Sequence, residues 1–331
     1  MKQTRVSAPA KIHLMGEHAV VYSNPALLSA INLRLTVTVA SIRPPVDGLE
    51  IRSPDFIFQG PYAEVIGAKH MEFLASALAV IEKSLGITYT PMQITLSSDV
   101  PIGFHLGSSA AVAVALTGAL MQFYTDQFDR KKINEVAYHI EKIAHGNPSG
   151  GDNTTVTYGG CIQFQKKAEG QFVVTPLSFP SSFLLTHFFL LNTGTPESTK
   201  DMVGAVKYFF DHNQTEKKRL LEGNEKATSM VRDALINDDE HLLIEGIRQG
   251  ERTLEGMGVV SKKVLSLIRA VEQAGGAAKI LGGGGKKDGV GFVLCYHAEK
   301  KKIQILAAKY RYPLQEIQLG EEGVRVEQTN G

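Results

Sequence analysis

The sequence predicts an α+β fold divided into two domains. Strand-like and helix-like segments follow one another without the regular β-α alternation that a doubly wound sheet requires. A length of 331 residues favours two domains over one. A serine- and proline-containing stretch at residues 178–182, centred on Pro180, precedes a strongly apolar segment and is typical of a linker. We therefore expect domains at residues 1–180 and 181–331.

Hydrophobic patterning predicts the main elements of the first domain. Strands are expected at residues 31–42, where apolar and polar residues alternate, and at 93–96. Residues 110–123 form a helix of small residues suited to close packing on a sheet. Residues 131–145 have apolar side chains at helical spacing, and Gly146 and Pro148 then stop the helix.

The second domain is expected to open with a strand at residues 183–192. Helices follow between residues 199 and 273. The last elements are strands at 277–281 and 290–296 and a helix at 303–309.

Composition excludes several classes of protein. Thirty-five Lys and Arg against 34 Asp and Glu leave a net charge of +1, too little to attract nucleic acid globally. The two cysteines, Cys161 and Cys295, form no C-x-x-C motif, which argues against a disulfide framework or structural zinc. Residues 1–14 lack the apolar core of a signal peptide, and the apolar runs are too short to cross a membrane. We expect a cytoplasmic protein.

The most informative segment is residues 101–111, PIGFHLGSSAA, which precedes an apolar helix. Gly103 and Gly107 allow a tight turn, and a helix start at Ser108 and Ser109 offers unpaired N–H groups to an anion. The segment lacks the lysine of a Walker A loop and the spacing of a dinucleotide fingerprint. It predicts a phosphate-binding loop, and a glycine turn with a serine N-cap is the alternative.

Lys11 lies in an otherwise apolar strand and either reaches solvent or meets an anion in a site. Glu17 and His18 follow Gly16 as a polar turn. Asp152, in a loop rich in glycine, could orient a substrate hydroxyl or could simply cap a turn.

Two oxygen-bearing residues are candidate magnesium ligands, because Mg²⁺ prefers oxygen donors. They are Ser109, at the helix start, and Glu141, at the margin of an apolar helical stripe. A third glycine-rich segment, residues 279–291, contains four consecutive glycines. We predict that these glycines have no packing role. They indicate either a backbone that a ligand approaches closely or the tip of a flexible hairpin.

These segments, in this order, resemble the GHMP kinase superfamily. Residues 8–11 with 16–18 resemble its first motif, 101–111 its second and 279–291 its third. Within the superfamily, the mevalonate kinase family is the most similar. The similarity rests on residues 16–22 (GEHAVVY), 149–153 (SGGDN) with 158–160 (YGG), and 192–194 (NTG) with 198–200 (STK). The resemblance covers nearly the whole chain.

The resemblance implies a ribosomal-S5-like N-terminal lobe, a ferredoxin-like C-terminal lobe and a nucleotide between them. It implies ATP and Mg²⁺ as cofactors, mevalonate as the small-molecule substrate, and a homodimer by family analogy. Asp152 and Lys11 would be catalytic, with Glu17, His18 and Tyr158 binding substrate. Ser109 and Glu141 would hold the metal. The residues expected to bind nucleotide are Pro101, Gly103, His105, Leu106, Gly107, Ser108, Ser109, Gly283 and Gly284.

The chain departs from the family pattern at several positions. His105 replaces a glycine of the second motif, and Leu281 and Gly283 replace Thr and Ala of the third. One hypothesis is that His105 or Lys286 adds a positive contact to the phosphates.

The expected activity is phosphorylation of the 5-hydroxyl of mevalonate. The alternatives are a related kinase acting on phosphomevalonate, the mevalonate 3-hydroxyl or a sugar, and a non-catalytic sensor of nucleotide or metabolite.

Overall fold

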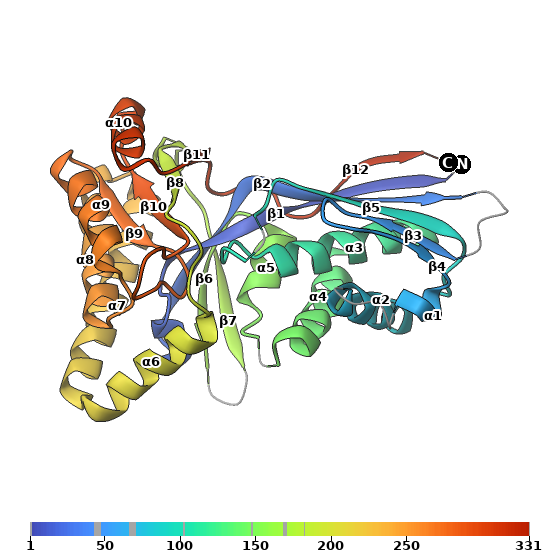
Figure 1. The fold of residues 1–331 in the computed structure, drawn as a ribbon, viewed down its shortest axis with the longest axis horizontal. Helices are drawn as coiled ribbons and strands as arrows, with labels where there is room; N and C mark the ends of the chain where they lie inside the picture. The colour runs from blue at the N-terminus through green and yellow to red at the C-terminus, as the bar shows by residue number, and fades with distance from the viewer. Residues whose placement is uncertain are drawn as a thin grey trace.

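A computed structural model describes residues 2–42, 48–65, 71–101, 103–146, 148–167, 171–181 and 183–330. Three residues of the predicted motifs and linker, Ile102, Asn147 and Ser182, lie outside the described residues. Two lobes, each a sheet with helices packed on it, confirm the predicted α+β fold (Figure 1).

The larger sheet has eight strands, ordered β12-β1-β2-β5-β3-β4, with β6 paired to β2 and β7 paired to β6. Its strands are β1 (Gln3–Met15), β2 (Ala26–Ser41), β3 (Leu49–Arg52), β4 (Ile57–Gly60), β5 (Met92–Ser98), β6 (Cys161–Lys166), β7 (Phe172–Leu177) and β12 (Arg325–Asn330). Its helices are α1 (Tyr62–Val65), α2 (Glu72–Leu85), α3 (Ser108–Thr125), α4 (Arg130–His145) and α5 (Gly151–Tyr158). Helices α2 to α5 gather on one face of this sheet (Figure 1).

The smaller sheet is antiparallel, with the order β11-β8-β10-β9. Its strands are β8 (Phe188–Asn192), β9 (Ala277–Ile280), β10 (Phe292–Tyr296) and β11 (Leu314–Ile317). The accompanying helices are α6 (Thr199–His212), α7 (Gln214–Asn237), α8 (Glu240–Gly256), α9 (Lys262–Gln273) and α10 (Lys300–Tyr310). Two short 3-10 helices, η1 (Ala19–Tyr22) and η3 (Leu184–Thr186), complete the elements used below.

Local sequence explains the helices that carry the site. Small residues let α3 lie close to the sheet, since a Cβ on Gly118 would come within 3.2 Å of Cγ1 of Val6. Helix α4 begins where the Asp129 carboxylate accepts hydrogen bonds from the amides of Lys131 and Lys132. Gly146 then ends α4 as predicted, with its amide bonded to the carbonyl of Lys142.

One predicted strand begins later than expected. The strand predicted at 183–192 starts at Phe188, because residues 184–186 form a 3-10 turn. The Thr186 hydroxyl donates to the carbonyl of Phe183 at 3.0 Å, and Nδ1 of His187 lies 2.8 Å from the same oxygen. These local hydrogen bonds compete with an extended backbone.

The chain end returns to the first sheet. Strand β12 pairs antiparallel with β1, so both termini lie at the same end of the larger lobe (Figure 1). The division at residue 180 stays a prediction, and it does not describe this last strand. None of the helices in the described part of the chain combines the length and apolarity that a bilayer span requires.

Candidate active site

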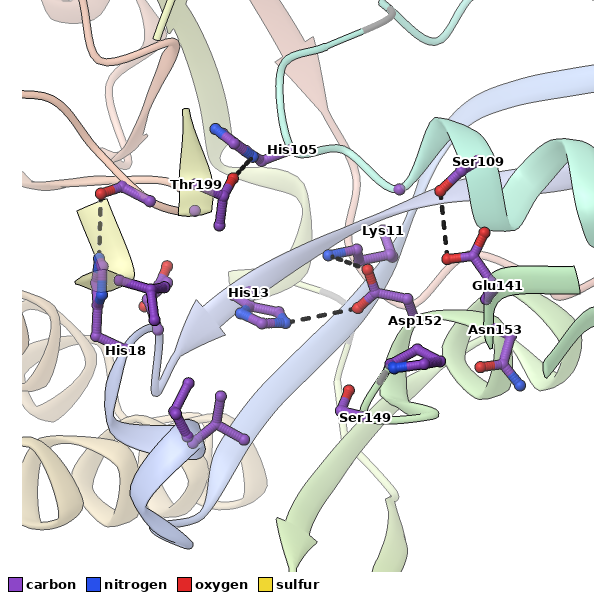
Figure 2. Close-up of a pocket in the computed structure, with 18 of the residues that line it drawn as sticks. Lys11, His13, His18, His105, Ser109, Glu141, Ser149, Asp152, Asn153 and Thr199 are labelled. Atoms are coloured by element: carbon purple, nitrogen blue, oxygen red, sulfur yellow. Dashed lines mark hydrogen bonds and ion pairs between the residues drawn. The ribbon is translucent and has the colours of Figure 1, made fainter. Parts of the chain in front are cut away.

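A cavity of about 680 Å³ collects most of the predicted site residues. Strand β1, the loop before α3, and helices α4 and α5 supply its walls from the larger lobe. The start of α6 and the glycine-rich segment supply its walls from the smaller lobe (Figure 2). The cavity is therefore built between the two sheets, from segments far apart in sequence.

Lys11 is a buried residue that faces this cavity. Its side-chain Nζ lies 2.9 Å from Oδ2 of Asp152, and only 7% of the side chain is exposed. Its amide donates to the carbonyl of Leu106 at 3.0 Å, which connects β1 to the predicted phosphate-binding loop. Its methylenes fill the space beside Gly107, where an added Cβ would lie 2.8 Å from Cγ of Lys11. The alternative of a solvent-facing lysine is therefore excluded.

Asp152 lies in the first turn of α5, after Gly150 with a positive φ of 83°. Burial alone would raise the pKa of Asp152, but the charge of Lys11, and then His13, hold it well below its usual range. Asp152 is thus a carboxylate at neutral pH, and 36% of its side chain is exposed. It can accept a hydrogen bond from a hydroxyl group that enters the cavity.

His13 is a functional candidate that the sequence prediction missed. Its Nε2 lies 3.7 Å from Oδ1 of Asp152, and it lines the cavity (Figure 2). Residues two apart on a strand face the same side, so Lys11 in a strand already pointed to His13 as its neighbour.

The predicted phosphate-binding loop leads into a helix start that, within the described residues, has no side-chain cap. Helix α3 starts at Ser108, and its N-cap is Gly107 with φ of 74° and, within the described residues, no side-chain capping bond. The alternative of a serine N-cap is therefore wrong. Gly103, Gly107, Ser108 and Ser109 all line the cavity. The first-turn amides and the positive end of the helix dipole favour an anion there.

Ser109 and Glu141 come together beside the helix start. The Ser109 hydroxyl donates to Oε2 of Glu141 at 3.3 Å, and both residues line the cavity (Figure 2). A hydroxyl and a buried carboxylate next to an anion site fit Mg²⁺, which takes few protein oxygens and completes its shell with phosphates and water. Within the described residues no cluster of three or more His, Cys, Asp or Glu could hold a metal. Ser109 and Glu141 offer two protein oxygens, a number that suits Mg²⁺ when phosphate and water supply its other ligands.

Glu17 and His18 connect the end of β1 to the smaller lobe. The Glu17 carboxylate pairs with Nζ of Lys279, and both residues are almost fully buried. Nε2 of His18 lies 3.1 Å from the carbonyl oxygen of Gly283. Burial lowers the pKa of His18, so its ring is neutral at neutral pH. Both residues line the cavity, and their contacts also join the two lobes.

The glycines of the third segment do have packing roles, contrary to the sequence prediction. A Cβ on Gly284 would overlap the carbonyl oxygen of Val259, and one on Gly282 would lie 2.5 Å from Cγ of His105. Two glycines of this segment, Gly283 and Gly284, were predicted to bind nucleotide. Gly283 lines the cavity, and Gly284 does not. Close packing against the Val259 backbone and the His105 side chain thus selects glycine at positions 284 and 282.

His105 bridges the lobes instead of presenting a cation. It has a positive φ of 63°, and its Nδ1 lies 3.1 Å from the Thr199 hydroxyl (Figure 2). Burial, reinforced by the charge of Lys11, lowers the pKa of His105, so its ring is neutral. This argues against the hypothesis of a positive contact from His105.

Other predicted residues lie outside the cavity lining within the described chain: Pro101, Leu106, Tyr158, Gly284 and Lys286. Leu106 is buried in the core, where its carbonyl accepts from Lys11. Tyr158 is 45% exposed, at the opposite end of α5 from Asp152. Conversely, Thr199 and Lys200 line the cavity although no site role was predicted for them.

Comparison with known proteins gives consistent similarities. Residues 72–160 match the family described as GHMP kinases N terminal domain. The chain is 27% identical to a mevalonate kinase of Thermococcus gammatolerans, over 98% of each chain. It is 29% identical to one of Pyrococcus abyssi, over 98% of this chain and 97% of the relative. The solved structure of L. major mevalonate kinase in complex with R-mevalonate superposes with a TM-score of 0.78, at 22% identity and 96% coverage of each chain.

Proposed function

This chain belongs to the GHMP kinase superfamily, and from that premise we propose that it transfers a phosphoryl group from ATP to the 5-hydroxyl of mevalonate. The observation that carries the proposal is the pair of Lys11 and Asp152, which faces the uncapped start of α3 across one cavity. Residues suited to bind an acceptor hydroxyl and residues suited to bind phosphate therefore line the same cavity. Full-length relatives named mevalonate kinases support mevalonate as the acceptor.

Each group of residues has a part in the reaction. The first-turn amides of α3 and the loop at Gly103 and Gly107 hold the phosphates of ATP. Asp152 accepts a hydrogen bond from the acceptor hydroxyl and orients its oxygen toward the γ-phosphorus. Lys11 keeps that carboxylate ionised and places a positive charge beside the transferred group. Phosphoryl transfer demands mainly this positioning and charge neutralisation.

Ser109 and Glu141 are the residues that would hold Mg²⁺, which supplies further neutralisation of phosphate charge when bound. Their hydroxyl and carboxylate oxygens, 3.3 Å apart at the helix start, support this assignment. Glu17 and His18 are proposed to shape the acceptor end of the cavity. A homodimer and a cytoplasmic location are part of the proposal and rest on family resemblance and composition.

A coupled ADP-release assay with MgATP tests the function. The acceptors are mevalonate, 5-phosphomevalonate, galactose and homoserine, and Asp152→Asn serves as the matched inactive variant. Turnover on mevalonate that Asp152→Asn abolishes is the expected result. Turnover only on another acceptor would reject mevalonate, and ATP binding without turnover on the whole panel would favour a sensor.

Phosphomevalonate and galactose are in the panel on structural grounds. A Streptococcus pneumoniae phosphomevalonate kinase and a Lactococcus lactis galactokinase share the fold, with TM-scores of 0.76 and 0.74. Their identities of 18% and 16% carry no information on substrate. The assay therefore has to discriminate among acceptors that this fold can accommodate.

A further inference from the structure

Among the described residues, two lysines line the cavity, and only one of them forms an ion pair. Lys11 pairs with Asp152 at 2.9 Å. Lys200 is exposed in the first turn of α6. Across the ranges that the structure describes, its ammonium group has neither an ion pair nor a hydrogen bond. The cavity therefore contains a positive charge that no described residue neutralises.

The acidic residues close to Lys200 in sequence leave its charge available. The Glu197 carboxylate accepts a hydrogen bond from the backbone amide of Lys286. Asp201 is exposed and does not belong to the described cavity lining. Consecutive side chains on a helix point in different directions, so Asp201 does not face what Lys200 faces. An anion for this lysine has to come from a ligand.

The start of α6 is fixed against two other walls of the cavity. The Thr199 hydroxyl lies 3.1 Å from Nδ1 of His105, in the predicted phosphate-binding loop (Figure 2). A Cβ on Gly283 would lie 3.2 Å from Cα of Thr199. Lys200 follows Thr199 directly, so these contacts set the position of its backbone. Its side chain stays available to a ligand in the cavity.

Apolar side chains line the cavity next to this lysine. Val203 follows the lysine by three positions on α6, and residues at this spacing share a helix face. Val20 and Val21 of η1 line the cavity as well. Helix η1 packs on α6 through Tyr22 and Phe210, whose ring centroids lie 5.2 Å apart. A cation beside aliphatic side chains suits a ligand that joins a carboxylate to an aliphatic chain.

We propose that Lys200 binds the carboxylate of the acceptor and thereby selects a hydroxy acid over a neutral polyol. This inference rests on the proposed function and names the residue that recognises the acid group. Mevalonate has a carboxylate at one end and the 5-hydroxyl at the other. Asp152 orients the hydroxyl end, and Lys200 holds the carboxylate end. A cation is required there, because the phosphates of ATP in the same cavity repel a second anion.

An ATP phosphate is the competing anion for Lys200. The phosphates have other binding groups, namely the amides at the start of α3 and the metal that Ser109 and Glu141 would hold. The valines beside Lys200 offer phosphate oxygens no side-chain hydrogen bond. They can pack against the methyl and methylene groups of mevalonate. The surroundings of Lys200 therefore favour the carboxylate.

Steady-state kinetics with two acceptors test the inference. The acceptors are mevalonate and 3-methylpentane-1,3,5-triol, in which a CH₂OH group replaces the carboxylate. Lys200→Met removes the charge from an unbranched side chain, and Lys200→Arg keeps the charge. Lys207→Met is the matched control, at an exposed lysine of the same helix that pairs with Asp211.

Lys200→Met should raise KM for mevalonate by roughly tenfold, the usual size for a charge-assisted hydrogen bond that a bound ligand shields from water. Its kcat and its KM for ATP should stay near the wild-type values, because the contact holds the substrate and the transition state alike. Lys200→Arg should restore most of the affinity, and Lys207→Met should behave as the wild type. The wild type should prefer mevalonate to the triol in kcat/KM by about tenfold, and Lys200→Met should lose that preference.

The outcomes separate the inference from the proposed function. A wild-type enzyme that fails to phosphorylate mevalonate refutes the proposed function, and with it a role of Lys200 toward that acceptor. Wild-type turnover combined with an unchanged KM for mevalonate in Lys200→Met overturns the inference alone. A rise in KM for ATP instead, or an equal loss with mevalonate and the triol, does the same. Circular dichroism and thermal melting verify that each variant is folded.

Discussion

Replacing Asp152 by Asn removes one charge from the cavity and changes its shape little. The carboxylate that faces Nζ of Lys11 at 2.9 Å becomes a neutral amide. Lys11, with 7% of its side chain exposed, then lacks its anion within the described site. The acceptor hydroxyl also loses a charged hydrogen-bond acceptor, so both orientation and electrostatics are affected.

The size of the effect follows from the geometry. Two unit charges 2.9 Å apart attract by about 6 kcal/mol at an effective dielectric constant of about 20, and by about 1.4 kcal/mol in bulk water. Asp152 is 36% exposed, so solvent screening places the interaction between these limits. A loss of about 3–5 kcal/mol from transition-state stabilisation corresponds to roughly 10²–10⁴ in kcat.

The assay is steady-state ADP release at saturating MgATP and mevalonate, with ATP affinity measured separately. Asp211→Asn makes the same chemical change at an exposed ion pair with Lys207 and serves as the matched control. Asp152→Asn should lose turnover and keep ATP binding, while Asp211→Asn should behave as the wild type. A near-normal kcat for Asp152→Asn would remove Asp152 from the mechanism.

Three further predictions concern other parts of the structure. Gly284→Ala should lower the free energy of unfolding by about 3 kcal/mol, because a φ of 75° is strained for alanine and the new Cβ would overlap the Val259 carbonyl. Gly258 has a φ of 76° but open space around it, so Gly258→Ala should lower that free energy less in the same denaturant titration. Glu141→Gln should raise the Mg²⁺ concentration for half-maximal rate by about tenfold, and an unchanged Mg²⁺ dependence would remove Glu141 from the metal site. The lowered pKa of His18 means that below about pH 6.5 the unfolded chain binds a proton that the folded chain does not, so stability falls as pH falls. Chemical denaturation at pH 7.5 and 5.5 should show a smaller fall for His18→Gln, and an equal fall would contradict this.

Local sequence predicted individual helices and strands better than it predicted which strands pair with one another. The alternation in β2 and the helical spacing in α4 follow from one segment each, and both elements formed as expected. Strand β12 has the polar sequence RVEQTN, and its pairing with β1, more than 300 residues away, depends on the assembled sheet. No local pattern could have placed it.

The site was predicted in part. Residues alone suggested a role for Lys11 and for Asp152, but their 2.9 Å contact across 141 positions required a family resemblance or a structure. His13 was within reach, because strand alternation places it beside Lys11. The packing of Gly284 against Val259 could not be predicted, because it joins the glycine-rich loop to the connection between α8 and α9, a contact that only the assembled fold creates.

The position of the new phosphate shows which hydroxyl of mevalonate accepts the phosphoryl group. The enzyme, MgATP and mevalonate labelled with ¹³C at carbon 5 would be followed by ¹³C and ³¹P nuclear magnetic resonance. We predict a single phosphate ester whose phosphorus couples to the labelled carbon, formed at a stoichiometry of one per ADP. A phosphate on the 3-oxygen, or ADP release without any ester of mevalonate, would contradict this prediction.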